Sequence, residues 1–274
     1  MSLMKTRKLK TISTTSLLAS STTLLGGAFC MLVCAPLAFA NGPSFEQGMD
    51  LPIERPDFKP AKPPRAPDPV STNTPVTSTP PPIFFGKDIS ATASIMYVID
   101  QSGSMSLSVQ SFTNDKGEII VGGNRMDRAK SELVKSISSL PSSFAFNVIF
   151  YDECIRPWKT ANVPATDSNK KLAYSFIGSQ QPMGFTNTGL GVATALTDKE
   201  NKAVVLLSDG EPNFLDCAAN YVGTYEEHRR LIRQANSQRA RIDCFGIGVA
   251  SNQDAMRFMQ DLAAENNGTY TEVN

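Results

Sequence analysis

The stretch Ser94-Ile-Met-Tyr-Val-Ile-Asp-Gln-Ser-Gly-Ser104 decides the expected fold. Its first half, up to Ile99, is a short apolar run, which is typical of a strand buried on both faces of a sheet. The run ends at Asp100, and a polar segment with one glycine follows at once. In sheets of parallel strands, ligands bind beyond the carboxyl ends of the strands. We therefore expect a ligand site where this strand ends.

Similar runs recur along the chain and alternate with segments of helical character. Strands are predicted at 144–151, 203–207, 242–249 and 269–273, with a short edge strand at 155–158. Helices are predicted at 126–140, 170–177, 189–196, 225–239 and 254–265. This alternation predicts an α/β fold, a Rossmann-like doubly wound and mostly parallel sheet with helices on both faces.

An insertion separates the decisive stretch from the first helix. It runs from about Ser106 to Asn124 and contains Asn114-Asp-Lys-Gly117 between stretches rich in Val, Ile and Phe. Turn residues between such stretches predict a small hairpin. Because the insertion begins beside the expected site, it could shape the choice of partner, or it could be only a decorated loop.

Residues 1–40 are predicted to be an export signal. Lys5, Arg7, Lys8 and Lys10 precede an apolar run from Leu24 to Ala40 that ends in Ala-Phe-Ala. We expect cleavage after Ala40. The alternative is an uncleaved membrane anchor at 24–40, because seventeen apolar residues approach the length that spans a bilayer. Either reading predicts a secreted, periplasmic or cell-surface protein.

Residues 41–82 hold 12 of the 18 prolines. Such a composition cannot bury enough apolar surface to fold, so we expect a disordered, semi-extended spacer. A Pro-rich ligand for another recognition module is the alternative. The globular domain is then predicted to span 83–274.

The charge balance excludes one class of partner. The formal net charge is zero, and without residues 1–40 the chain has 22 Lys and Arg against 26 Asp and Glu. Nucleic-acid binding needs a basic patch or stripe, so no nucleic-acid partner is expected.

Three polar segments fall at loops on the carboxyl edge of the predicted sheet. They are Asp100-Gln-Ser102-Gly-Ser104, Gly184-Phe-Thr186-Asn-Thr188 and Asp209-Gly210. Asp100 and Asp209 offer two carboxylates, and Ser102, Ser104 and Thr186 offer three hydroxyls, all of them hard oxygen donors. Mg²⁺ is commonly held by only one or two carboxylates and keeps several waters. This donor set favours Mg²⁺, with Mn²⁺ or Ca²⁺ as alternatives, and leaves a coordination position for another anion.

These three segments resemble the metal-ion-dependent adhesion site of the von Willebrand factor A-like family, and the resemblance covers about residues 83–274. It implies that Asp100, Ser102, Ser104, Thr186 and Asp209 hold the cation. It also implies that the last coordination position accepts an Asp or Glu carboxylate of a protein partner. The family's strand order is 3-2-1-4-5-6, with one short antiparallel edge strand.

One departure from the family pattern concerns the C-terminal end. Many members end with a helix after the last strand, and its sliding couples metal coordination to a distant surface. Here the sequence stops at Asn274, which puts that coupling in doubt. We hypothesise that the apolar Ile83-Phe84-Phe85 covers the groove that the helix would fill.

Cysteine and histidine add little to the site. After cleavage Cys154, Cys217 and Cys244 remain, an odd number, and Cys244 in an apolar run fits a small buried side chain. The single histidine, His228, lies among charged residues and is expected on the solvated surface. With only one histidine, hydrolytic triads are nearly excluded.

The leading prediction is a non-enzymatic, metal-dependent adhesion or assembly module with no small-molecule substrate. Met105, Phe185, Glu211, Pro212 and Phe214 are expected to flank the metal, either touching a partner or packing the loops. One alternative is a Mg²⁺-dependent phosphoryl-transfer enzyme with Asp100 as nucleophile, although no second acid or base accompanies it. Another is a structural envelope subunit whose metal only staples the loops.

Overall fold

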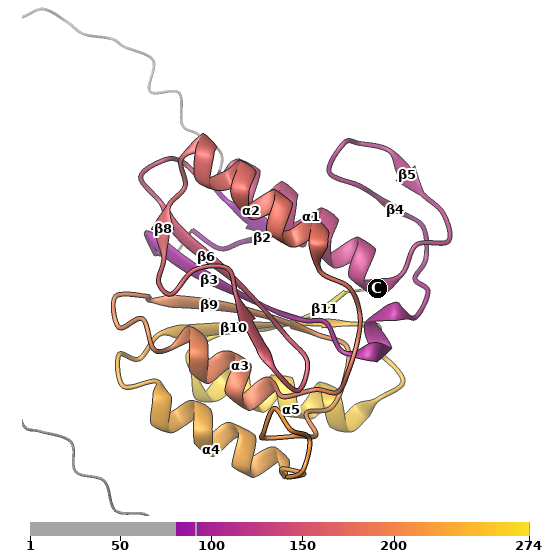
Figure 1. The fold of residues 1–274 in the computed structure, drawn as a ribbon, viewed down its shortest axis with the longest axis vertical. Coiled ribbons are helices and arrows are strands. Elements are labelled where there is room, and N and C mark those ends of the chain that lie inside the picture. Colours follow the sequence, from indigo (N-terminus) through magenta and orange to yellow (C-terminus); the bar gives the residue numbers. More distant parts are fainter. Residues whose placement is uncertain (1–80, 91, 274) are drawn as a thin grey trace, which may run out of the picture. The chain divides into compact units, whose positions relative to one another are not determined.

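The computed structural model describes residues 81–90 and 92–273 (Figure 1). The predicted export signal at 1–40 and nearly all of the predicted spacer at 41–82 lie outside these residues and stay predictions. Within the described part of the chain, no helix is both long and apolar enough to cross a bilayer.

A seven-stranded sheet lies at the centre of the fold. Its parallel strands are β3 (Ser94–Asp100), β6 (Ala145–Tyr151), β9 (Ala203–Ser208), β10 (Arg241–Ile247) and β11 (Tyr270–Val273). Two short strands, β7 (Ile155–Pro157) and β8 (Val163–Pro164), pair antiparallel with β6. The order β7-β6-β3-β9-β10-β11 is the expected 3-2-1-4-5-6. The sequence did not predict β8, because two residues carry no readable alternation.

Helices cover both faces of the sheet, as predicted (Figure 1). The helices are α1 (Arg125–Ser139), α2 (Asp167–Ser179), α3 (Thr188–Ala195), α4 (Tyr225–Ala235) and α5 (Gln253–Glu265), and a 3₁₀ turn, η1, spans Gly103–Ser106. Helix α2 starts three residues before its predicted start, because Thr166 caps it. Helix α4 stops four residues early, where the Asn236 side chain accepts the N–H of Ala240 and Arg239 takes a left-handed φ of 55°.

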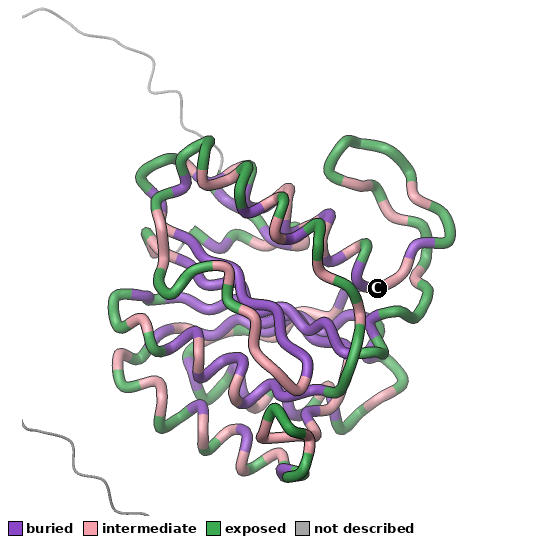
Figure 2. The backbone as a smooth tube through the Cα atoms, in the orientation of Figure 1, coloured by how far each residue is buried: buried purple, intermediate pink, exposed green. Residues whose placement is uncertain are grey.

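The core consists of two apolar layers separated by the sheet. Side chains of β3 alternate between them: Ile95, Tyr97 and Ile99 join the layer under α1 and α2, and Met96 and Val98 join the layer under α3, α4 and α5. All five are almost wholly inaccessible, and Figure 2 shows the strands as the buried centre. The apolar run read from the sequence is therefore a strand buried on both faces.

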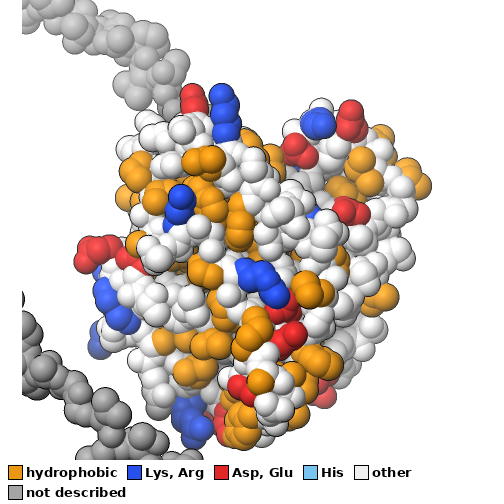
Figure 3. All heavy atoms as spheres, in the orientation of Figure 1, with side chains coloured by type: hydrophobic (Ala, Val, Ile, Leu, Met, Phe, Trp, Pro, Cys, Tyr) orange, Lys and Arg blue, Asp and Glu red, His pale blue; other side chains and the backbone are white. Residues whose placement is uncertain are grey.

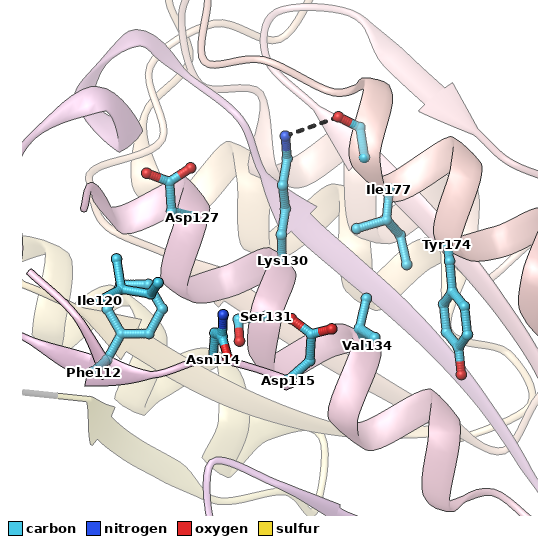
Figure 4. A pocket seen from close by; sticks show the side chains of 11 residues that line it. Phe112, Asn114, Asp115, Ile120, Asp127, Lys130, Ser131, Val134, Tyr174 and Ile177 are labelled. Carbon is cyan, nitrogen blue, oxygen red and sulfur yellow. Dashed lines mark hydrogen bonds between the residues drawn. The ribbon is translucent and has the colours of Figure 1, made fainter. Parts of the chain in front are cut away.

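The insertion forms the hairpin that its sequence predicted. Strand β4 (Phe112–Thr113) pairs antiparallel with β5 (Ile119–Ile120), and the Asn114 side chain accepts the N–H groups of Lys116 and Glu118 in the turn. A pocket of about 330 Å³ lies between the hairpin, α1 and α2 (Figure 4). None of the five predicted metal-site residues lines this pocket.

A second hairpin precedes the sheet, formed by β1 (Ile83–Phe84) and β2 (Lys87–Asp88). Phe84 is fully buried, and its ring meets that of Phe245 on β10 edge-on, with centroids 4.9 Å apart. Lys87 donates to the Thr269 hydroxyl next to β11. The segment hypothesised to cover this part of the sheet therefore does pack there.

Candidate functional site

The register of the sheet brings two of the three polar segments side by side. Strand β3 is the central strand and pairs with β6 and β9, with Asp100 opposite Tyr151 and Ile99 opposite Leu207. Ser208 is therefore the neighbour of Asp100, and Asp209 follows it. The two carboxylates leave adjacent strands at the same edge of the sheet, as the topology predicted.

Hydrogen bonds join the first and third segments through their side chains. The Ser102 and Ser104 hydroxyl oxygens lie 3.1 Å apart, and the Ser104 hydroxyl donates to Asp209 Oδ1 at 2.8 Å. The Ser102 backbone N–H donates to Asp100 Oδ1 at 2.8 Å. Asp100, Ser102 and Asp209 are buried, whereas Ser104 is exposed, so this cluster opens to solvent on the Ser104 side.

The Thr186 segment is attached to both of the others through its main chain. The Gly103 N–H donates to the Gly184 carbonyl at 3.1 Å, which joins it to the Asp100 loop. Asn213, four residues after Asp209, accepts the Thr186 N–H on its side chain and donates its own N–H to the Thr186 carbonyl, both at 2.8 Å. All five predicted residues therefore come from three loops that contact one another.

Glycine is required at position 184. Its φ is +68°, and a Cβ built there would lie 2.0 Å from Glu153 Oε2. That same carboxylate oxygen accepts the Phe185 N–H at 2.7 Å. Asn187 then caps α3 by accepting the N–H of Leu190. Thr186 is thus held between a fixed turn and a helix start.

The two carboxylates of the site lie in an environment that disfavours their charge. Burial, and then the nearby charge of Asp209, raise the pKa of Asp100 to about 7, against hydrogen bonds from Ser208 and Ser102 that lower it. Burial also raises the pKa of Asp209, and Arg125 and Ser104 oppose that shift. A cation between the two carboxylates would relieve the cost of both charges.

The chemistry of the donors fits a hard divalent cation. They are carboxylate and hydroxyl oxygens, and across residues 81–90 and 92–273 no three His, Cys, Asp or Glu side chains form a cluster. Two carboxylates with hydroxyls match the low carboxylate count of Mg²⁺ sites. These residues have the chemistry to hold such an ion, and the assignment of all five as ligands remains a proposal.

Sequence reasoning missed three residues that shape this site. The Ser208 hydroxyl donates to Asp100 Oδ2 at 2.6 Å, Asn213 holds Thr186, and Arg125 pairs with Asp209 Oδ2 at 2.6 Å. Ser208 could have been found, because it ends a predicted strand directly before Asp209. No sequence pattern links Arg125 or Asn213 to the site, because their contacts depend on how the loops fold.

The residues expected to flank the metal divide into two groups. Met105 and Pro212 are buried, so they pack the loops and are not available to a partner. Glu211 accepts a hydrogen bond from the Tyr225 hydroxyl. Phe185 is 50% exposed, and its ring lies 4.7 Å from that of Phe214, measured between centroids. The aromatic pair is the part of this set that a partner could touch.

A disulfide joins Cys154 to Cys217 and leaves Cys244 as a buried free thiol. This outcome matches the odd count and the buried position expected of Cys244. The disulfide ties the loop after β6 to the segment after β9. Both segments hold the Thr186 loop, the first through Asp152 and Glu153 and the second through Asn213.

The expectation that His228 lies on the solvated surface is wrong. Its side chain is fully inaccessible, and Nδ1 accepts the Gly189 N–H in the first turn of α3 at 3.0 Å. The sequence did contain a signal. His228 lies four residues before the buried Ile232, so both occupy one face of α4. The prediction failed because the residues next to His228 in the sequence are charged and indicated an exposed position.

The burial of His228 predicts a pH-dependent stability. Burial lowers its pKa to about 4, against Glu227, which raises it, so the folded protein holds the ring neutral. Its contribution is complete above the unfolded pKa of about 6.5 and is lost as the pH falls toward 4. We expect the stability advantage of wild type over His228→Asn to shrink by roughly 3 kcal/mol between pH 7 and 4.

Chemical denaturation of both proteins at each pH measures this difference, and the comparison removes the opposing contribution of Asp100, whose raised pKa has the reverse sign. Parallel pH profiles for the two proteins would refute the role assigned to His228.

Comparisons with known proteins agree with this architecture. The profile of the von Willebrand factor type A domain matches residues 93–272. Inter-alpha-trypsin inhibitor heavy chain H4 from Homo sapiens is 26% identical over 186 residues, covering 64% of this chain and 17% of the relative. The heavy chain H1 from Mesocricetus auratus is 24% identical over 187 residues, covering 64% and 18%. The chain thus spans less than a fifth of the length of these two relatives.

Solved structures show the same fold at low identity. A von Willebrand factor type A protein from Catenulispora acidiphila has a TM-score of 0.51 and 22% identity, covering 66% of this chain and 38% of that one. The pilus adhesin SpaC from Lactobacillus rhamnosus GG, in its open conformation, has a TM-score of 0.50 and 14% identity, covering 66% and 28%. Because the family profile matches well over half of its residues, this chain belongs to the von Willebrand factor type A domain family.

Proposed function

We propose that this protein is an exported, metal-dependent module that binds a protein partner by capturing an Asp or Glu carboxylate. Asp100, Ser102, Ser104, Thr186 and Asp209 would hold Mg²⁺ or a similar ion, and the partner would complete its coordination. The ion supplies a strong local field for the carboxylate, and the surrounding surface supplies specificity. The observation that carries the proposal is the meeting of three loops around two buried carboxylates that lack a full counter-charge.

The surface around the cluster suits a protein ligand. Exposed apolar side chains belong to the loops that form the site: Met183 and Phe185 beside Thr186, and Leu107 just after η1. The face in Figure 3 shows charges of both signs mixed with apolar patches, and no field of one sign that would favour nucleic acid. This chain is similar to inter-alpha-trypsin inhibitor heavy chains and to a pilus adhesin, which is compatible with protein partners.

The structure gives no support to phosphoryl transfer by Asp100. A nucleophilic carboxylate in phosphoryl transfer works with an acid or base group beside it. Here the groups that bond the Asp100 oxygens are the Ser102 N–H and the Ser208 hydroxyl, and neither titrates near neutral pH. A binding role for the site is therefore the better supported proposal.

The first test is binding of Mg²⁺ by isothermal titration calorimetry. Even outer partners of metal ligands cost about 10–100-fold in affinity when mutated, so Ser102→Ala should lose at least about tenfold. Ser138→Ala is the matched control, because Ser138 is exposed on α1 and its hydroxyl bonds only to the Lys135 carbonyl of the same helix. Circular dichroism should show both variants folded.

The second test is capture of partners from an exported fraction with and without EDTA. The proposal expects capture by wild type and by Ser138→Ala in Mg²⁺, and loss in EDTA or with Ser102→Ala. Capture that persists unchanged in EDTA would contradict it. If Mg²⁺ binds but no carboxylate ligand strengthens its binding, the metal has only a structural role and holds the loops together.

A further inference from the structure

Arg125 is a cation at the edge of the candidate metal site that the proposed coordination does not use. Its Nη1 lies 2.6 Å from Asp209 Oδ2, and its Nη2 donates to the Gly248 carbonyl at 3.0 Å. The Asp209 side chain is fully buried and that of Arg125 is 16% exposed, so solvent screens this ion pair little.

Three separate parts of the fold fix the arginine in this place. Arg125 is the first residue of α1, whose start is set by a capping box between Asn124 and Asp127. Its backbone N–H donates to the Leu107 carbonyl. Gly248 has a φ of +67°, and a Cβ there would lie 2.6 Å from the Arg125 Nε. The guanidinium thus occupies space that only glycine leaves open.

The two oxygens of Asp209 have different partners. Oδ1 accepts the hydroxyl of Ser104, which is one of the proposed ligands, and Oδ2 pairs with Arg125. The arginine therefore does not occupy the oxygen that faces the hydroxyl donors. A metal ion and Arg125 can share this carboxylate without either being displaced.

The presence of both Arg125 and a metal ion at Asp209 changes the charge balance of the site. With a divalent cation between them, Asp100 and Asp209 would both be ionised, because the cation offsets the cost of burying their charges. Their two negative charges and the positive charge of Arg125 then leave one net negative charge for the protein part. A divalent cation would make the site positive by one unit, and a single carboxylate from a partner would restore neutrality. Repulsion between Arg125 and the ion also weakens binding of the ion alone.

We propose that Arg125 is a charge-balancing residue that keeps the affinity for the bare divalent cation low and makes tight metal binding depend on a carboxylate ligand. This inference rests on the proposed function, because it assigns a role to Arg125 at the same site. By linkage, the carboxylate strengthens metal binding by the same factor by which the metal strengthens carboxylate binding.

Calorimetric titration with MgCl₂ tests this proposal, with acetate as the carboxylate probe and chloride at matched ionic strength as its blank. In wild type, acetate should raise Mg²⁺ affinity several-fold. Arg125→Gln should bind Mg²⁺ alone roughly tenfold more tightly than wild type, because a nearby positive charge is gone, and the effect of acetate should shrink. Arg125→Lys keeps the charge and should resemble wild type.

Arg128→Gln is the matched control. It removes the same charge from the same helix, but Arg128 lies over the Phe85 ring and not beside Asp209. Its Mg²⁺ affinity and acetate effect should equal those of wild type.

The outcomes separate this inference from the function on which it rests. If no protein binds Mg²⁺, the proposed function fails. If wild type binds Mg²⁺ equally well in acetate and chloride, the charge-balancing role fails. This comparison uses the wild-type protein alone. If Arg125→Gln folds but binds Mg²⁺ more weakly than wild type, the arginine only orients Asp209, and the proposal is overturned while the metal site stands.

Discussion

Loss of the Cys154–Cys217 disulfide is expected to lower the free energy of unfolding by about 4 kcal/mol. The cysteines are 63 positions apart, and a cross-link that closes a long loop removes much of the freedom of the unfolded chain. The effect should appear both in wild type under reductant and in the double variant Cys154→Ser/Cys217→Ser. Urea denaturation followed by circular dichroism measures it.

The same change should weaken metal binding. The disulfide joins the two segments that hold the Thr186 loop from either side, through Glu153 and through Asn213. With those segments released, Thr186 loses its fixed position and Mg²⁺ affinity should fall. Reductant added to the double variant is the control and should change nothing. An unaltered midpoint of unfolding on reduction would contradict the structural role of this bond.

Phe84→Ala is expected to destabilise the domain by about 3–5 kcal/mol, the range for a large aromatic side chain removed from a core. Phe84 is fully buried against Tyr97 on β3 and Phe245 on β10, so alanine would leave a cavity beneath the β1–β2 hairpin. Thermal or chemical unfolding of the purified variant measures the loss.

Ile83→Ala provides the comparison for Phe84→Ala. Ile83 is the preceding residue in the same strand, but it is 44% exposed, so its truncation should cost much less than that of Phe84. If Phe84→Ala cost no more than Ile83→Ala, the segment before the sheet would not be part of the core. The hypothesis that it covers this face would then be lost.

The sequence predicted most of the sheet, because its strands are buried on both faces and read as continuous apolar runs. The runs that end at Ile99 and Leu207 place their two polar loops at one edge once the strands are parallel. The third polar segment, at Thr186, was read from its place before a predicted helix. The resemblance to the family supplied the strand order. The two-residue strand β8 and the C-terminal end of α4 were not readable, because short pairings and caps depend on a few local contacts.

The sequence by itself determined the alternation of strands and helices, and with it the edge where Asp100, Thr186 and Asp209 meet. Periodicity is a property of neighbouring residues, so one chain suffices to read it. The tertiary structure alone decided that Arg125 pairs with Asp209, that Cys154 bonds Cys217, and that His228 accepts the Gly189 N–H of α3. Each of these contacts joins residues 39 to 84 positions apart. Such pairs form only because packing of the helices on the sheet brings distant segments together, and no local pattern encodes that.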